Sequence, residues 1–419
     1  MGGSTHSLLP TYRFSIPQNA VPSRPRPPAA MPRPIVASAP PPPDLVANQH
    51  IYRDYFKEEF TQTLDENILQ LLDRVWFRSE LVGFDDYPQR NNPDRPLIFA
   101  SNHSGMAFPW DAIVALSHLW RHLQQCHGHL RDLPRPLSAP LLSATTLMNP
   151  YLVRNFWKKC GSVDATTRNF ETMMYYQDHN LMLYPEGVAG IGKGFNRKYQ
   201  LQRLATSMIR MSLLHGTDIV PFYCINGEYL DPYAYSFAWV NRLVKKIGIP
   251  FLPITGLLLL MVVQPWIFYL ALPAKLTFVM GTRIRPADLT AKAHDALTRP
   301  EYEALGEQVR SRMQAELDAA VIAHGQHPYQ WRELWQRMKE NRRFFPFFLP
   351  FAWPAAFAEF ERRFVTNGER NFKMRLDAPG AFWKMLWRNP LVLAYFIPLL
   401  GWIPLAIKGY KNHKLGRKP

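Results

Sequence analysis

The chain has 419 residues, and its 49 Lys and Arg residues exceed its 33 Asp and Glu residues to give a formal net charge of +16. This length suits one large α/β domain with appended segments, or two domains. The positive charge indicates an anionic partner such as a phospholipid surface, a nucleic acid or a phosphorylated substrate. A mean hydropathy of −0.22 excludes a polytopic membrane bundle. The 12 Trp residues favour a protein that lies on or dips into a bilayer.

Cysteine usage points to a reducing compartment. The chain has three cysteines, at Cys126, Cys160 and Cys224, and an odd count at unrelated spacings argues against a disulfide framework. His118, His122 and Cys126 are spaced for one helical face. A structural zinc site needs four well-placed ligands, however, so we expect no metal site and read this segment as a polar helix end.

Residues 1–45 are rich in Pro, Arg, Ala and Ser, and the first acidic residue is Asp44. This composition cannot bury a core, so we expect a disordered tail, with an organellar transit peptide as the alternative. The remaining chain is predicted to form a folded domain over residues 46–325 and an aromatic, basic region over 326–419.

Helix and strand signals alternate in the folded domain. The order of these elements predicts an α/β layer fold, in which ligands bind beyond the carboxyl ends of the strands. His103 and Glu186 both follow predicted strands, so we expect them to share a site. Helices are predicted over 50–74, 110–125, 150–159, 168–178 and 199–215, and strands over 75–84, 96–100, 137–142, 180–184, 219–225 and 275–281.

Three apolar stretches interrupt this alternation, at residues 247–274, 344–357 and 390–407. Prolines within the first and last would break a spanning helix, so we expect interfacial or re-entrant insertion into a membrane. A buried core element is the alternative for 247–274. Basic residues on both sides of 390–407 give no clear orientation by the positive-inside rule.

His103 and Asp111 are the first candidate catalytic pair. They lie in a loop between a predicted buried strand and a predicted helix start. A carboxylate that binds one imidazole nitrogen leaves the other free to act as a general base. A surface histidine beside a helix-capping aspartate is the alternative.

The residues Asn102-His103-Ser104-Gly105 followed by Phe108-Pro109-Trp110-Asp111 resemble the first motif of the glycerol-phosphate and lysophospholipid acyltransferase superfamily. Its members carry Asn-His-x4-Asp, whereas seven residues separate His103 from Asp111 here. Pro109, two residues before Asp111, resembles the proline at this position in family branches that act on neutral glycerolipids, such as diacylglycerol acyltransferases. The resemblance implies a mixed central sheet flanked by helices, with membrane-associating segments.

Two further blocks extend the resemblance. Residues 161–169 are similar to the second motif of the family. This similarity implies that Arg168 and Asn169 bind the substrate, Arg168 through a phosphate. A solvated arginine beside a Thr166 cap is the alternative. Tyr184-Pro185-Glu186-Gly187 is similar to the family's Phe-Pro-Glu-Gly, which implies that Glu186 orients the acceptor alcohol. Val188-Ala189 stand where lysophosphatidate enzymes usually have Thr-Arg. Lys193, Arg197 and Lys198 are candidate replacements for the missing phosphate-binding arginine, and otherwise the acceptor is neutral.

The resemblance covers residues 75–325 and implies a membrane-associated O-acyltransferase. His103 is the expected base and Asp111 its partner. Acyl-CoA or acyl-carrier protein is the expected donor, and lysophosphatidate, another lysophospholipid or diacylglycerol the expected acceptor. Ser104 and Gly105, with Asn102 and Gly187, are candidates for stabilising the oxyanion. No metal or other cofactor and no nucleic acid are expected.

The expected location is the cytoplasmic face of a bacterial inner membrane, with an organelle membrane as the alternative, and the expected partner is an anionic lipid surface. Two other functions stay open. One is a membrane-binding scaffold with a degenerate acyltransferase site. The other is a nucleotide-binding protein, because Gly187 to Lys193 satisfy a P-loop pattern up to its last position.

Overall fold

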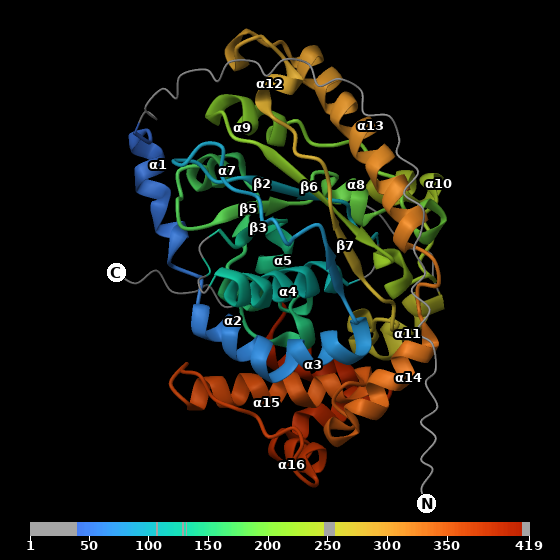
Figure 1. Ribbon diagram of the computed structural model, residues 1–419. Coiled ribbons are helices and arrows are strands. Elements are labelled where there is room, and N and C mark those ends of the chain that lie inside the picture. Colours follow the sequence, from blue (N-terminus) through green and yellow to red (C-terminus); the bar gives the residue numbers. More distant parts are fainter. Residues whose placement is uncertain (1–39, 106–107, 128–129, 131, 247–255, 413–419) are drawn as a thin grey trace, which may run out of the picture. The chain divides into compact units, whose positions relative to one another are not determined.

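The computed structural model describes residues 40–105, 108–127, 130, 132–246 and 256–412 (Figure 1). The predicted disordered tail therefore lies outside the described residues, except for its last positions. These positions include the start of a short helix, Pro43–Asn48.

A seven-stranded sheet forms the centre of the fold, with strand order β1-β7-β6-β2-β5-β3-β4. All neighbouring strands are parallel except β6 and β7, which are antiparallel, so the sheet is mixed. The strands are β1 Glu80–Val82, β2 Ile98–Ser101, β3 Pro134–Ser138, β4 Val163–Asp164, β5 Asn180–Leu183, β6 Ile219–Ile225 and β7 Thr277–Met280.

Helices cover both faces of this sheet, as expected for an α/β layer fold (Figure 1). The α-helices are α1 Pro43–Asn48, α2 Glu58–Leu64, α3 Gln70–Leu72, α4 Trp110–His127, α5 Pro140–Ala144, α6 Phe156–Lys159, α7 Thr167–Met173, α8 Gly187–Ile191, α9 Ser207–His215, α10 Ala238–Lys245, α11 Gly256–Val263, α12 Pro286–Leu289, α13 Arg299–His324, α14 Trp331–Glu340, α15 Trp353–Thr366, α16 Ala381–Arg388 and α17 Ile403–Lys408.

Shorter helical turns join these elements. Two π-helical turns, Asp65–Leu69 and Asp73–Phe77, flank α3. The 3₁₀ turns are Gln49–Tyr52, Thr146–Met148, Pro150–Leu152, Phe195–Arg197, Gly227–Leu230, Pro265–Tyr269, His294–Ala296, Arg342–Phe344, Pro350–Ala352, Pro390–Phe396 and Leu400–Trp402.

The predicted elements agree with the structure where the sequence signal is strong and differ where side-chain packing decides. The strands at 180–184 and 219–225 and the helix at 110–125 are confirmed within a few residues. The helix expected over 50–74 is broken after Tyr52, and helical structure continues to Phe77 through the π-helical turns. Of the strand expected over 75–84, only Glu80–Val82 is therefore extended. The helix expected over 199–215 begins only at Ser207.

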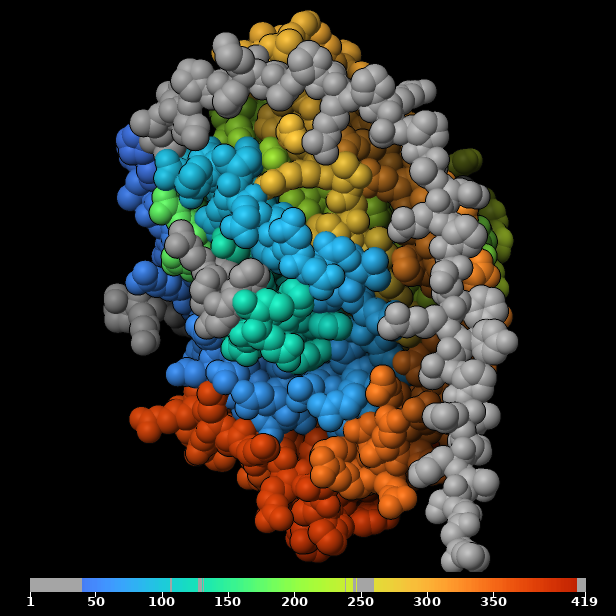
Figure 2. All heavy atoms as spheres, viewed as in Figure 1, coloured from blue at the N-terminus to red at the C-terminus, as the bar shows by residue number. Residues whose placement is uncertain are grey.

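Alternate residues of the central strands pack on opposite faces, as the strand pleat requires. Leu97 and Phe99 belong to a hydrophobic core beneath α4, whereas Ile98 and Ala100 belong to a second core beneath α9 and α13. The long helix α13 begins with a capping box formed by Thr298 and Glu301. On the face drawn in Figure 2, residues of the N-terminal part of the described chain (blue to cyan) form the middle of the surface, above the C-terminal helices (orange to red).

The C-terminal region does not form a separate domain. Trp353 of α15 is fully buried, and its ring lies 5.1 Å from that of Trp110 and 5.9 Å from that of Phe77. Residues 326–412 therefore share the core beneath α4, and the described chain from Pro40 onward is one compact unit. The division expected near residue 325 is not visible in the packing.

The apolar stretches form short helices and turns. In the described part of 247–274, the helical segments are α11 and the turn Pro265–Tyr269, and residues 247–255 lie outside the described residues. Residues 390–407 form two 3₁₀ turns and most of α17. Among all described helices, none combines the length and the apolar character that a bilayer-crossing helix needs.

Replacement of Trp353 by Ala tests the shared core. We expect a loss of about 3–5 kcal/mol in the free energy of unfolding, because the variant leaves a cavity among aromatic rings. The matched control is Trp387→Ala in α16, whose side chain is 88 % exposed in the wild-type protein; it should change stability by no more than about 0.5 kcal/mol. Equal urea midpoints for the two variants would contradict the shared core.

Candidate functional site

Three parallel strands end at the same edge of the sheet, and each is followed by a loop of the candidate site. β2 pairs with both β5 and β6, and Ser101 at its carboxyl end lies opposite Phe222. Asn102 exchanges two hydrogen bonds with the backbone of Cys224: its amide nitrogen donates to the carbonyl at 3.1 Å, and its side-chain oxygen accepts from the N–H at 2.8 Å. Asn102 thus fixes the start of the histidine loop to β6.

Glu186, which follows β5, joins this loop to the Pro-Glu-Gly turn. One carboxylate oxygen accepts a hydrogen bond from the His103 backbone N–H at 2.8 Å, and the other accepts from the Gln202 N–H at 2.7 Å. The Glu186 side chain is fully buried. Hydrogen bonds to a buried carboxylate are strong, so Glu186 sets the position of the His103 backbone.

The His103 imidazole is held by packing. Its ring stacks on Tyr184, with 4.5 Å between ring centroids and 25° between ring planes. A Cβ atom added to Gly190 would lie 2.9 Å from the His103 Cβ, so α8 can approach the ring only because residue 190 is glycine. Tyr184 and Gly190 therefore restrict the orientation of the imidazole.

The surroundings keep this imidazole neutral. Burial lowers the pKa of His103 from its usual 6.5 to about 3, and the positive charge of Lys193 acts in the same direction. A neutral imidazole is the form that accepts a proton. His103 is therefore in the protonation state that a general base needs at neutral pH.

Asp111 is buried in the first turn of α4. Burial raises its pKa to about 6, against the opposing effects of the Ala112 N–H and the Ser104 hydroxyl. Its Oδ2 atom finds no hydrogen-bond partner among the described residues. The charge of Asp111 also helps to raise the pKa of Tyr184, the residue on which the His103 ring stacks.

The expected hydrogen bond between His103 and Asp111 is not seen. Within the described part of the site, the hydrogen bonds and ion pairs include none between these two side chains. The reason lies in the local structure. The long connection places Asp111 on α4, where the Ala112 N–H and the Ser104 hydroxyl are its neighbours.

Lys193 lies between two carboxylates in the interior. Its Nζ atom is 3.8 Å from Glu186 Oε1 and 3.4 Å from Glu228 Oε1, and the side chains of all three residues are almost completely buried. Gly105 has a φ of +80°, and a Cβ at this position would lie 2.6 Å from the Lys193 carbonyl oxygen. Because Lys193 is buried in these contacts, the structure does not favour the nucleotide-binding alternative.

Glu228 is a site residue that the sequence prediction missed. Its Oε1 atom also accepts a hydrogen bond from the Tyr199 N–H at 2.9 Å. The preceding Gly227 touches the histidine loop, since a Cβ there would lie 2.7 Å from the Ser104 Cβ. A signal was present, because Asn226-Gly227-Glu228 directly follows β6 at the same edge as His103 and Glu186.

Arg168 and Asn169 lie away from this cluster. They begin α7 after β4, the outermost strand, which two further strands separate from β2. The Arg168 guanidinium is exposed and donates to the Asp44 carbonyl at 2.8 Å. Thr166 caps the helix by accepting from the Asn169 N–H at 3.1 Å. This arrangement is the alternative given above, an exposed arginine beside a Thr166 cap.

Pro185 and Gly187 shape the turn around Glu186. The Pro185 carbonyl accepts a hydrogen bond from the Ala205 N–H at 2.7 Å. Gly187 is exposed and has a φ of +55°, a conformation that favours glycine. Both residues therefore support the position of Glu186 from the backbone.

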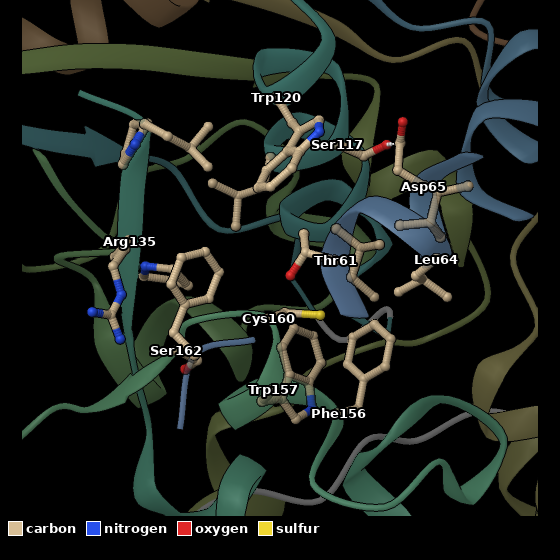
Figure 3. Close-up of a pocket in the computed structure, with 17 residues that line it drawn as sticks. Thr61, Leu64, Asp65, Ser117, Trp120, Arg135, Phe156, Trp157, Cys160 and Ser162 are labelled. Carbon is tan, nitrogen blue, oxygen red and sulfur yellow. Dashed lines mark hydrogen bonds between the residues drawn. The ribbon is translucent and has the colours of Figure 1, made fainter. Parts of the chain in front are cut away.

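An apolar cavity of about 50 Å³ lies beneath α4. Ile113 and Leu116 of α4 line one side, and Phe156 and Trp157 line another, as Figure 3 shows for the aromatic pair. The Trp157 ring also packs on Phe108, at 6.2 Å between centroids. Phe108 belongs to the connection between His103 and Asp111, so one lining residue of the cavity packs on that connection.

The described residues contain no group of three or more side chains placed to hold a metal ion. His118 instead hydrogen-bonds the Ser79 hydroxyl at 2.8 Å, and His122 the Phe84 carbonyl at 3.0 Å.

Comparisons with known proteins give relatives without an assigned function. No family model matches the chain. Uncharacterized proteins of Mycobacterium tuberculosis and Mycobacterium bovis are 27 % identical over 264 residues, which is 62 % of this chain and 67 % of each relative. A Mycobacterium leprae protein is 26 % identical over the same length, 62 % of this chain and 65 % of its own.

Among solved structures, the 1-acyl-sn-glycerophosphate acyltransferase PlsC from Thermotoga maritima covers 65 % of this chain and 93 % of its own, with 13 % identity and a TM-score of 0.32. A likeness of this strength carries no argument about this chain.

The protonation state of His103 can be measured directly. We expect its imidazole NMR signals to stay in the neutral form from pH 7.5 down to below pH 5, because the folded-state pKa is near 3. The signals are assigned by their loss in His103→Gln. The folded pKa lies below the unfolded value of 6.5, so the stability from neutral His103 is complete above pH 6.5 and is lost as pH falls toward 3. A titration midpoint near 6.5 in the folded protein would contradict this account.

Proposed function

We propose that the chain is an O-acyltransferase that moves an acyl group from acyl-CoA or acyl-carrier protein to a hydroxyl of a glycerolipid. The observation that supports this most strongly is the placement of a neutral, packed imidazole at a strand edge, next to a buried glutamate that binds its backbone. The sequence motifs around His103 and Glu186 support the same reaction class.

In the proposed reaction, His103 takes the proton of the acceptor hydroxyl as the oxygen attacks the carbonyl carbon of the thioester. A C–O bond forms, and the carbonyl oxygen gains negative charge. The C–S bond then breaks, and the departing thiolate takes the proton from the imidazolium. No covalent enzyme intermediate is needed.

Backbone N–H groups of the histidine loop are the proposed donors to the developing oxyanion. The N–H of His103 itself is bound to Glu186, so we assign this role to the N–H groups of Ser104 and Gly105. Glu186 would then act through the loop, as a positioning residue, and not on the acceptor alcohol as the family resemblance implies.

The charges around His103 favour an acceptor without a phosphate near its hydroxyl. Glu186 and Glu228 surround the single ammonium of Lys193, and Asp111 lies near the same site. Arg168, the expected phosphate ligand, is bound to the carbonyl of Asp44. We therefore propose a neutral glycerolipid such as diacylglycerol, with lysophosphatidate or another lysophospholipid as the alternative.

The apolar cavity beneath α4 is the proposed place for the far end of the acyl chain. Its lining is almost entirely apolar, and Trp157 connects it to Phe108 in the histidine loop. Cys160 also faces the cavity, where burial raises the pKa of its thiol to about 12 and so keeps it protonated.

A catalytically inactive scaffold is the second candidate function. It is favoured by one observation, the absence of a described hydrogen bond between His103 and Asp111. The two candidates differ in whether the protein forms an ester.

Purified protein supplied with labelled acyl-CoA, or with acyl-carrier protein, should form an ester with diacylglycerol, and less with lysophosphatidate. His103→Ala should lower the rate by about 10²–10⁴-fold, because it removes the base. The matched control is His50→Ala, which removes an exposed histidine in the first 3₁₀ turn. No ester formation by the wild-type protein, or equal rates for His103→Ala and wild type, would reject the proposed mechanism.

A larger side chain in the cavity should change the preferred acyl length. Leu116→Phe is expected to lower the rate with long acyl chains by about tenfold while short chains react normally, because one or two buried methylene groups are worth about 1–2 kcal/mol. Leu214→Phe, at an exposed position of α9, is the control. An unchanged chain-length profile in Leu116→Phe would exclude the cavity as the acyl site.

A further inference from the structure

Two apolar segments that are far apart in sequence form one exposed face. We define the α11 face as the exposed side chains of Leu260, Val262 and Val263 together with those of Phe396, Ile397, Leu399, Leu400, Trp402 and Ile403. Each of these large apolar side chains is at least 39 % exposed. Contiguous apolar surface of this kind marks an interaction site in soluble proteins.

Specific hydrogen bonds hold the two segments together. The Leu399 N–H donates to the Val263 carbonyl at 2.7 Å, and the Trp402 indole N–H donates to the Val262 carbonyl at 2.7 Å. The Gln264 side-chain amide donates to the Ile397 carbonyl at 2.9 Å. A Cβ at Gly401 would lie only 1.7 Å from the Gln264 side-chain oxygen, so a larger residue at position 401 would displace this amide. The α11 face is therefore a built surface.

The same segment continues into the candidate site. Tyr269, six residues after Val263, is buried, and its ring lies 5.1 Å from that of Phe108. The Trp110 indole N–H donates to the Tyr269 carbonyl at 2.8 Å. Phe108 and Trp110 both lie between His103 and Asp111. An apolar molecule at the α11 face would thus be next to the segment that packs on the histidine loop.

The charge pattern identifies the kind of partner. Residues 256–274 and 389–407 contain no Asp, Glu, Lys or Arg, whereas exposed Arg388 and Lys411 lie just outside the second range. Trp402 adds an amphipathic ring, of the kind enriched at membrane–water interfaces. Basic residues that flank an uncharged apolar stretch in the sequence match an anionic bilayer, with its hydrocarbon below charged headgroups.

We propose that the α11 face inserts into the surface of an anionic phospholipid bilayer and brings the histidine loop to the lipid acceptor. This inference rests on the proposed function for its purpose. The docking itself can be measured without any acyl donor or acceptor, so the two proposals can fail separately.

The test is sedimentation of the full chain with phosphatidylcholine vesicles, with and without phosphatidylglycerol. Val262→Glu places a charge at a position that is 60 % exposed, and it should weaken vesicle binding by tenfold or more. The matched control is Ile322→Glu on α13, where the side chain is 74 % exposed; it should bind like wild type. Equal loss in both variants would overturn the proposal.

A second variant keeps the test independent of folding defects. Leu399 is 63 % exposed and has a φ of +65°, a conformation that Asn tolerates better than Leu, so Leu399→Asn should fold and still bind vesicles more weakly. Arg388→Gln with Lys411→Gln should weaken binding only when phosphatidylglycerol is present.

Normal binding by Leu399→Asn and Val262→Glu would overturn the proposal, as would a change in their oligomeric state without a change in vesicle binding. Vesicle binding through this face by a protein that forms no ester would leave the docking intact and reject the acyltransferase.

Discussion

The candidate site depends on one buried carboxylate. Glu186 accepts hydrogen bonds from the backbone of His103 and of Gln202, and it lies beside the ammonium of Lys193. Burying a carboxylate is costly unless hydrogen bonds and a counter-charge compensate it. This requirement makes the arrangement specific. If the loops after β2 and β5 moved apart, a charge would remain in the interior without its partners.

The chemistry of the site follows from the same burial. Burial lowers the pKa of His103 to about 3 and raises that of Asp111 to about 6. The imidazole is therefore neutral without a described hydrogen bond to Asp111, and stacking on Tyr184 and contact with Gly190 orient it. A base prepared in this way differs from the histidine–aspartate pair that the sequence motif implies. Packing supplies the orientation that a carboxylate would otherwise give.

Sequence patterns predicted the features that depend on local structure. The strands before His103 and Glu186 were recognisable as short apolar runs, and parallel strands bring their carboxyl ends to one edge. Features that depend on distant packing were not predictable. The sequence around Arg168 does not indicate that its guanidinium binds the Asp44 carbonyl of α1. The sequence around Trp353 does not indicate that its ring packs on Trp110. Lys193 was one candidate for a phosphate ligand, but its burial between Glu186 and Glu228 is a property of the folded chain.

The most direct test of the central claim is amide hydrogen exchange in Glu186→Gln. A glutamine can accept from one of the two N–H groups but presents its own NH₂ group to the other, so about 1–3 kcal/mol of local stability should be lost. Exchange at the His103 and Gln202 amides should accelerate by at least about tenfold, and acyl transfer should fall with it. In Glu186→Gln, exchange at the amides of α13 should be unchanged. The control variant Glu303→Gln alters a partly exposed ion pair with Arg203, and it should leave exchange at the His103 and Gln202 amides unchanged. Unaltered protection at His103 and Gln202 would contradict the account.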